Sequence, residues 1–319
     1  MFLYLNEEQV ASLVTVREAI GLLEKAFRSW HAGRAINEPR RRLRYPGGTL
    51  HWLSAALPAA GYFGYKAYTT AAGKARFFFH LFDAASGQLL AMMEADQLGQ
   101  IRTGAASGLA TRLLARAGAR TAAIIGSGWQ ARSQLEAIAS VRDFSEVRVW
   151  SRQPDNVASF IEAMSVAGAP LRSAASAREA VEGAEVICTA TFAAEPVLRE
   201  EWVAAGCHIN ATGSNALTRR ELPTALLTRA DLVVVDSRRQ AALEAGDFLE
   251  GIERGLLHLD RMRELAEIVA DPSRGRVDAR QITVFKSLGL ALEDLAVGIF
   301  VYEKARAQGI GAEFGGEVT

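Results

Sequence analysis

The chain has 319 residues, with 36 Lys and Arg against 36 Asp and Glu, so its formal net charge is +0. Hydrophobic residues make up 50% and charged residues 23%, which is typical of a globular protein, and the length allows two domains with separate cores. A neutral chain has no long-range field that attracts nucleic acid or an anionic membrane. We therefore expect a small-molecule partner, and neither nucleic acid nor a membrane.

The N-terminus and the two cysteines bear on where in the cell the protein is located. The stretch MFLYLNEEQVASLV has acidic residues where a signal peptide needs positive charge, and no uninterrupted apolar run is long enough to span a bilayer. Cys188 and Cys207 lie in apolar, strand-like surroundings. We expect buried thiols there, not a disulfide or a metal pair, and this fits a reducing cytoplasm.

The first third of the chain predicts a helix followed by a sheet. Apolar residues at helical spacing cover 16–32 and end at Gly33. Strand-like runs separated by the turns PGG, AAGK and AASGQ then predict an antiparallel sheet, at 49–53, 62–69, 77–82 and 89–94. Small residues over 103–114 predict a helix that crosses to the next part of the chain.

From Arg120 onward, strands and helices alternate. Apolar strands are expected at 121–125, 147–151, 185–189, 208–212 and 232–236, with helices at 130–139 and 156–167. A strand at 282–288 and a helix at 291–308 follow, and the helix is expected to pack back on the first domain. The fold class predicted is α/β, with a Rossmann doubly wound parallel sheet and a second α+β domain.

The stretch IIGSGWQARSQ carries the spacing GxGxxA in Gly126, Gly128 and Ala131. It follows an apolar strand and opens a helix, which is the context of a dinucleotide-binding turn. Gly126 allows the tight turn, Gly128 lets backbone N–H groups approach phosphates, and Ala131 allows close helix–strand contact. A glycine-rich turn without a ligand is the alternative.

The end of the next strand bears on the choice of cofactor. An NAD site usually has a carboxylate there for the ribose hydroxyls, whereas this chain has Ser151 and Arg152. A hydroxyl and a guanidinium suit a 2′-phosphate, so NADP(H) is favoured over NAD(H). The alternative is that Arg152 is a solvated surface residue.

Three cationic residues stand in unusual surroundings in the first half of the chain. Lys66 lies within GYKAY, Arg102 precedes the small-residue helix, and Arg41 lies in PRRR. Each alone is explained by snorkelling or an ion pair, but together they suggest a clamp for a substrate carboxylate. Neighbouring arginines could take the place of Arg41, namely Arg40, Arg42 and Arg44. No metal-ligand pattern accompanies them.

Six segments together give the chain a family resemblance: GYKAYTT, QIRTGAAS, IIGSGWQARSQLEA, HINATGSNALTRREL, VVVDSRRQAALEAGD and ITVFKSLGLALEDL. They resemble the ornithine cyclodeaminase and mu-crystallin family and follow its order over nearly the whole chain. The resemblance implies a substrate-binding and dimerisation domain of residues 1–113 with 293–319. It also implies a Rossmann domain of residues 114–292, an active site in the cleft and a homodimer.

The resemblance also implies roles for single residues. The substrate carboxylate would be bound by Arg41, Lys66 and Arg102. The cofactor would be bound by Thr103, Gly126, Ser127, Gly128, Trp129, Gln130, Ala131, Ser151, Arg152, Thr191, Gly213, Asn215 and Ser287.

One departure from the family pattern affects the expected chemistry. Ornithine cyclodeaminases carry a catalytic Asp after the strand HINA, where this chain reads Gly213-Ser214-Asn215. An Asn amide cannot take up a proton, so the sequence argues against cyclodeamination, although Asn215 can still hydrogen-bond the nicotinamide or the substrate nitrogen.

We therefore expect an NAD(P)H-dependent oxidoreductase that reduces an imino acid to an L-amino acid. The resemblance suggests a cyclic ketimine such as Δ1-pyrroline-2-carboxylate or Δ1-piperideine-2-carboxylate, with Lys66 supplying the proton. The alternatives are an amino-acid dehydrogenase of the alanine type, an ornithine cyclodeaminase, and an NADPH- and ligand-binding protein like mu-crystallin.

Overall fold

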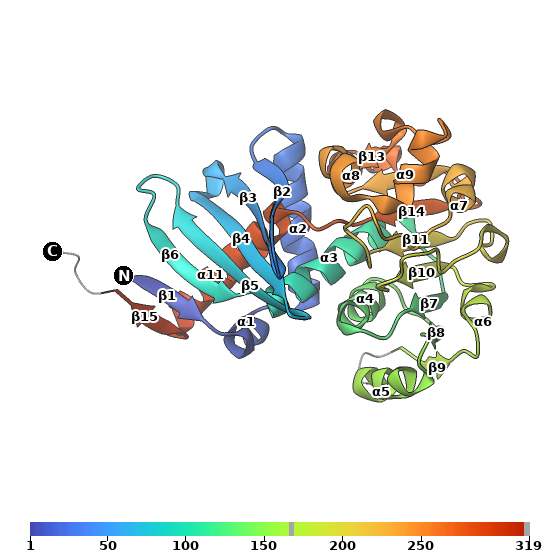
Figure 1. The fold of residues 1–319 in the computed structure, drawn as a ribbon, viewed down its shortest axis with the longest axis horizontal. Helices are drawn as coiled ribbons and strands as arrows, with labels where there is room; N and C mark the ends of the chain where they lie inside the picture. Colours follow the sequence, from blue (N-terminus) through green and yellow to red (C-terminus); the bar gives the residue numbers. More distant parts are fainter. Residues whose placement is uncertain (166–168, 316–319) are drawn as a thin grey trace. The chain divides into compact units, whose positions relative to one another are not determined.

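The computed structural model describes residues 1–165 and 169–315 and divides the chain into two compact units (Figure 1). Unit 1 comprises Met1–Arg102 with Leu290–Thr319, and unit 2 comprises Thr103–Gly289. The sequence placed the first boundary at residue 113 and the last at 293. The first boundary differs because helix α3 (Asp96–Leu114) runs through it without a break.

Unit 1 is built on a mixed sheet. Among the described residues its strand order is β15-β1-β6-β5-β4-β3-β2, antiparallel except where β1 pairs with β6. Three of the four predicted strands lie within longer ones and the strand predicted at 89–94 matches β6, whereas β1, β2 and β15 were not predicted. The bounds are β1 (Phe2–Leu5), β2 (Ile36–Tyr45), β3 (Gly48–Leu57), β4 (Tyr62–Ala71), β5 (Lys74–Asp83), β6 (Leu89–Glu94) and β15 (Ala312–Phe314).

Helix α11 packs against this sheet, and helix α2 packs against α11. Helix α1 (Glu7–Leu13) leads into α2 (Val16–His31), which begins at a capping box formed by Thr15 and Glu18. Helix α11 (Ala291–Gln308) contacts α2 and strands β2 to β5, and Figure 1 shows it along one face of the sheet. The prediction that the last helix returns to the first domain is confirmed.

The two faces of this sheet differ along strand β4, because successive side chains alternate between them. Gly64 and Lys66 are buried on the face that packs against α11. Phe63 and Tyr65 lie on the other face and are partly exposed. This alternation places the Lys66 side chain on the packed face, where it is removed from water.

Unit 2 is a doubly wound parallel sheet, as predicted. Its strand order is β13-β12-β14-β11-β10-β7-β8-β9, with every described pair parallel. From β7 the chain builds β8 and β9 on one side and then returns to β10 on the other. The topological switch point, where such folds bind ligands, therefore lies between β7 and β10.

The strands and helices predicted in unit 2 are present with similar bounds, whereas β9, β13 and α6 to α10 were not predicted. The strands are β7 (Thr121–Ile125), β8 (Glu146–Trp150), β9 (Leu171–Ser173), β10 (Val186–Thr189), β11 (His208–Ala211), β12 (Leu232–Val235), β13 (Arg263–Glu264) and β14 (Thr283–Lys286). The helices are α4 (Trp129–Ala139), α5 (Pro154–Met164), α6 (Ala177–Val181), α7 (Thr224–Arg229), α8 (Arg238–Glu244), α9 (Gly246–Glu253) and α10 (Leu265–Ala270). The end of the helix predicted at 156–167 lies partly outside the described residues.

Both cysteines are buried and free, as the sequence predicted. Burial raises the pKa of the Cys188 and Cys207 thiols to about 12 in each case, so both are protonated at neutral pH. Among the described helices, none is both long enough and apolar enough to cross a bilayer.

Two glycines in helix interiors test how tightly unit 1 is packed. A methyl group at Gly298 of α11 would lie 2.5 Å from Cε1 of Phe79 on β5, whereas one at Gly21 of α2 meets nothing within 4 Å. Gly298→Ala should lower the free energy of unfolding by about 1–3 kcal/mol through overpacking. Gly21→Ala should raise it by about 0.5–1 kcal/mol through helix propensity. Urea denaturation measures both, and equal stability of the two variants would contradict this packing.

Candidate functional site

The turn between β7 and α4 has the geometry of a pyrophosphate-binding loop. Gly126 has φ 113°, and a methyl group there would lie 2.5 Å from the carbonyl oxygen of Ala190. At Gly128, the N-cap of α4, an added methyl group meets nothing within 4 Å, so the backbone is open to a ligand. Ala131 is fully buried, as close helix–strand contact requires. Each small residue of GxGxxA thus has the surroundings that a dinucleotide needs.

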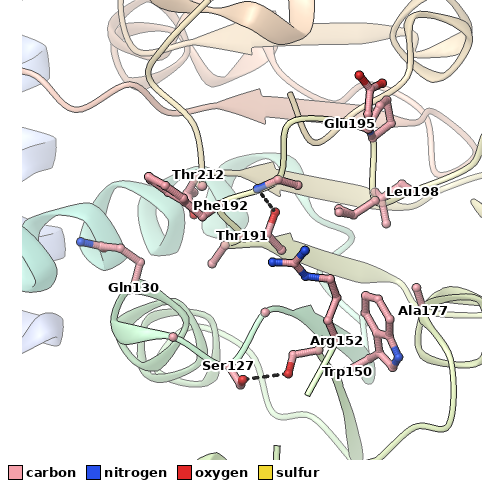
Figure 2. A pocket seen from close by; sticks show the side chains of 18 of the residues that line it. Ser127, Gln130, Trp150, Arg152, Ala177, Thr191, Phe192, Glu195, Leu198 and Thr212 are labelled. Carbon is pink, nitrogen blue, oxygen red and sulfur yellow. Dashed lines mark hydrogen bonds between the residues drawn. The ribbon is translucent and has the colours of Figure 1, made fainter. Parts of the chain in front are cut away.

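A cavity of about 1080 Å³ opens at this turn within unit 2. Figure 2 shows Trp150 and Arg152, at the end of β8, and Thr191 and Phe192, after β10, on different sides of it. The predicted cofactor residues that line the cavity are Gly126, Ser127, Gly128, Trp129, Gln130, Ser151, Arg152, Thr191 and Gly213. The volume and the position over the switch point fit a dinucleotide.

The cavity wall at the end of β8 presents hydroxyl and guanidinium groups. The Ser127 hydroxyl donates to Oγ of Ser151 over 2.9 Å, and the Ser151 hydroxyl donates to the carbonyl of Gln153 over 3.1 Å. Arg152 is exposed, and its side chain extends into the cavity in Figure 2. No carboxylate follows β8 directly, so hydroxyls and a cation line this part of the cavity.

Four predicted cofactor residues are not among the described residues that line this cavity. Ala131 lies beneath the turn, and Thr103 is buried, with its carbonyl accepting from Nε2 of Gln134 over 3.3 Å. Ser287 is buried after β14, while Asn215 is exposed in the loop that follows β11. Their assignment to the cofactor stays a prediction.

Unit 1 holds a buried network of charges around Lys66 and Arg102. The Lys66 side chain is 3% exposed, and its Nζ lies 3.1 Å from Oδ1 of Asp294. Arg102 donates through Nε to the same oxygen over 3.0 Å, and through Nη1 to Oε2 of Glu293 over 2.8 Å. Both carboxylates belong to the first turn of α11 and are fully buried. Helix α3 passes so close to Nζ of Lys66 that position 99 has space only for a glycine.

Arg40, and not Arg41, is the buried arginine of strand β2. Arg40 is 6% exposed, whereas the Arg41 side chain is exposed. The pairing of β2 with β3 shifts register between Glu38 and Arg41, so a bulge brings Arg40 opposite the buried Leu53. Leu53 in turn pairs with Lys66. The structure therefore places Arg40 beside the network, and the residue that the sequence pointed to is its neighbour.

Unit 1 gathers several buried charged residues in one place. Among the described residues of this unit, the buried charged side chains are Arg40, Lys66, Arg102, Glu293 and Asp294. Three of the five are cations, and cations of this kind bind carboxylates through charge-assisted hydrogen bonds.

Burial lowers the pKa of the Lys66 ammonium below its usual range. Asp294 raises this pKa in part, while Arg102 and then Arg40 lower it further. Burial acts on Arg102 in the same direction, but Asp294 and Glu293 outweigh it and raise the pKa of the guanidinium. Lys66 is thus the member of the network that gives up a proton more readily, and Arg102 stays charged.

The sequence pattern did not point to Glu293 and Asp294 as partners of Lys66 and Arg102, although both lie in ITVFKSLGLALEDL, a segment that carries the resemblance. Two adjacent acids inside an otherwise apolar helix are the signal that could have found them. Glu221, fully buried behind the cavity of unit 2, was missed in the same way. In the described part of the chain, no group of three or more His, Cys, Asp or Glu is arranged to hold a metal ion.

The fold and the cavity define unit 2 as a Rossmann-type dinucleotide-binding unit, within a two-unit protein whose other unit holds a buried network of charged side chains. The sequence profile of the ornithine cyclodeaminase/mu-crystallin family matches residues 3–309. The chain belongs to this family.

Three known proteins illustrate the likeness. The chain is 40% identical over 233 residues to the Δ1-pyrroline-2-carboxylate reductase of Bacillus cereus, covering 72% of this chain and 71% of that protein. The structure of the Thermococcus litoralis Δ1-pyrroline-2-carboxylate reductase, with NADH and L-proline, matches with a TM-score of 0.94 and 34% identity, over 98% of this chain and 100% of that one. An archaeal alanine dehydrogenase dimer with bound NAD matches with a TM-score of 0.93 and 32% identity, over 98% and 99%.

The network makes a prediction about stability. Arg102→Met would leave Glu293 and Asp294 buried with one cation partner fewer, and should lower the free energy of unfolding by about 3–5 kcal/mol. Arg178→Met removes an exposed ion pair with Glu182 and should change stability little. Urea denaturation compares them. A loss at Arg102 as small as that at Arg178 would show that the network is not a structural requirement.

Proposed function

We propose that this protein reduces the C=N bond of an imino acid with NAD(P)H and gives an L-amino acid. It is an NAD(P)-dependent oxidoreductase, and a cyclic ketimine such as Δ1-pyrroline-2-carboxylate is the substrate that its relatives favour. The observation that carries the proposal is the buried cluster of Arg40, Lys66 and Arg102 in unit 1. A small substrate that bears a carboxylate can form charge-assisted hydrogen bonds with such cations, whereas a neutral substrate cannot.

The residues of unit 2 fit the cofactor that this reaction needs. The turn from Gly126 to Gly128 and the N-terminus of α4 would hold the pyrophosphate through backbone N–H groups. Ser151 and Arg152 would hold the adenosine ribose. When bound, the reduced nicotinamide supplies the hydride that the C=N carbon accepts.

The cations of unit 1 would bind and polarise the substrate. We assign the carboxylate to Arg40, Lys66 and Arg102, with Arg40 taking the role that the sequence gave to Arg41. A protonated imine accepts hydride far better than a neutral one, so the imine nitrogen needs a nearby acid. The Lys66 ammonium is the group whose lowered pKa suits it to pass this proton to the nitrogen, either directly or through water.

A linear imine is the second candidate substrate, because the archaeal alanine dehydrogenase resembles this chain as closely in fold. Cyclodeamination of ornithine is disfavoured, since Asn215 stands where the family's cyclodeaminases have an acid. An NADPH-oxidation screen over cyclic imino acids, and over keto acids with ammonia, separates the candidates. A protein that binds NADPH but turns over none of them would be a binding protein.

Lys66 is the residue on which the chemistry depends most. Lys66→Met keeps the apolar stem and leaves the pairing of Arg102 with Asp294 in place. It should raise the Michaelis constant and lower turnover roughly a hundredfold or more, because an anchoring charge and a general acid are both lost. Steady-state reduction of Δ1-pyrroline-2-carboxylate at saturating cofactor measures this. Lys74→Met, at an exposed position of β5, is the matched control. A folded Lys66→Met enzyme with the parental rate and affinity would make Lys66 purely structural.

We further propose that NADP(H) is preferred over NAD(H), although the two related structures contain NADH and NAD. The support is the hydroxyl pair of Ser127 and Ser151 beside Arg152, with no carboxylate after β8. Calorimetric titration should give tighter binding of NADPH than of NADH. Arg152→Ala should weaken NADPH about tenfold or more and leave NADH unchanged, since a guanidinium–phosphate contact is a charge-assisted hydrogen bond. Equal affinity for both cofactors, unaltered in the variant, would refute the preference.

A homodimer is the oligomeric state that we propose. Phe63 stacks on Phe82 with ring centroids 5.0 Å apart, and Tyr65 on His80 at 4.6 Å, on the face of the unit 1 sheet turned away from α11. A partly exposed aromatic sheet face suits a second copy of the chain, and the related alanine dehydrogenase is a dimer. Light scattering at micromolar concentration should give twice the mass of the chain. A monomer mass would be the opposite result.

The cellular location that we propose is the cytoplasm. Cys188 and Cys207 are both unpaired and buried, which favours a reducing compartment. Fractionation of the source cells tests this directly.

A further inference from the structure

Glu221 is a buried carboxylate behind the wall of the cofactor cavity. Its Oε1 accepts from the backbone N–H of Thr191 over 2.7 Å and from the Thr191 hydroxyl over 2.8 Å. Its Oε2 accepts from the hydroxyl of Thr189 over 2.8 Å and from the N–H of Gly213 over 2.7 Å. One carboxylate therefore ties together the segments that leave strands β10 and β11.

These two segments form a single wall of the cavity. Thr191 and Gly213 both line it, and a methyl group at Gly213 would collide with the carbonyl oxygen of Thr191 and with Oε1 of Glu221. The backbone carbonyl of Glu221 also accepts from the N–H of Val197 over 2.8 Å. The loop from Thr191 to Val197 is thus held to Glu221 at both of its ends.

A second buried pair holds Glu221 in place from behind. The Glu221 N–H donates to Oδ1 of Asp247 over 2.6 Å, and Oδ2 of Asp247 lies 2.8 Å from Nζ of Lys286. All three side chains are buried. Lys286 lies at the end of β14, at the same edge of the sheet as the ends of β10 and β11. The cluster therefore spans three neighbouring strands.

The position of this wall in the sheet indicates which half of a dinucleotide would lie against it. The pyrophosphate turn follows β7, and the adenosine ribose is expected at the end of β8. The ends of β10 and β11 lie beyond β7 in the other direction, where the second mononucleotide of a doubly wound fold is bound.

We propose that Glu221 is a positioning residue that fixes Thr191 and Gly213 against the nicotinamide half of the cofactor. This inference rests on the proposed function, since it presumes that the cavity binds NAD(P). Every partner of the carboxylate is a donor, and two of the four are backbone N–H groups that cannot reverse their direction. An amide in place of the acid would set its own NH2 group against Thr191 or Gly213. The wall therefore requires an acceptor at both oxygens.

Binding without turnover tests the proposal through Glu221→Gln. Isothermal titration calorimetry compares NADPH with 2′-phospho-ADP-ribose, which lacks the nicotinamide ring. The variant should bind NADPH about tenfold or more weakly, because a buried donor facing a donor costs at least one charge-assisted hydrogen bond. The analogue should lose less than about threefold in affinity. Glu182→Gln, an exposed acid of the same unit, should match the parent for both.

Equal losses for the two ligands, or no loss, would overturn the positioning role. Failure of the parent protein to bind either ligand would instead overturn the proposed function, so the two failures are distinguishable. If Glu221→Gln does not fold, amide hydrogen exchange on the parent protein without ligand decides the matter. The N–H groups of Thr191 and Gly213 should be strongly protected by Glu221, and rapid exchange at both would overturn the proposal.

Discussion

The buried ion pairs of Lys66 and Arg102 with Glu293 and Asp294 are the interaction on which the rest of unit 1 depends. Lys66 and Arg102 are removed from water on two different elements, and neither is tolerable there without carboxylate partners. Those partners, Glu293 and Asp294, come from the far end of the chain, so α11 must return to the sheet that carries Lys66. Arg40 is a third buried cation beside this network. If the substrate carboxylate binds here as we propose, stability and binding rely on the same side chains.

In unit 2 the central buried group is a carboxylate, and its partners are hydrogen-bond donors. Its turn after β7 offers backbone N–H groups to phosphates, while Glu221 takes up neighbouring N–H and hydroxyl groups at the ends of β10 and β11. Donors that face the cavity remain for the cofactor, and donors that face inward are satisfied by the acid. The cofactor wall is thus preorganised by the protein before any ligand binds, which reduces the ordering cost of binding.

The sequence predicted those parts of the fold that follow from local pattern. Strand β7, helix α4 and helix α11 appear where apolar periodicity and a GxGxxA turn predict them. Strand β2 was not predicted, because PRRRLRY has no apolar alternation and its pairing depends on β3. The choice of Arg41 over Arg40 has the same origin, since a bulge reverses which side chains face inward and no local signal marks it. The partners of Lys66 and Arg102 lie about two hundred positions away in the sequence, so no local spacing pattern could have identified them.

The most direct test of the central claim, that the buried cations of unit 1 recognise a substrate carboxylate, removes the carboxylate and keeps the imine. The measurement is kcat/KM for reduction of Δ1-pyrroline-2-carboxylate and of Δ1-pyrroline by the same enzyme at saturating NADPH. The substrate without the carboxylate should lose roughly a hundredfold or more, because the loss of a carboxylate bound by buried cations costs several kcal/mol. Values of kcat/KM within about threefold of each other would contradict it.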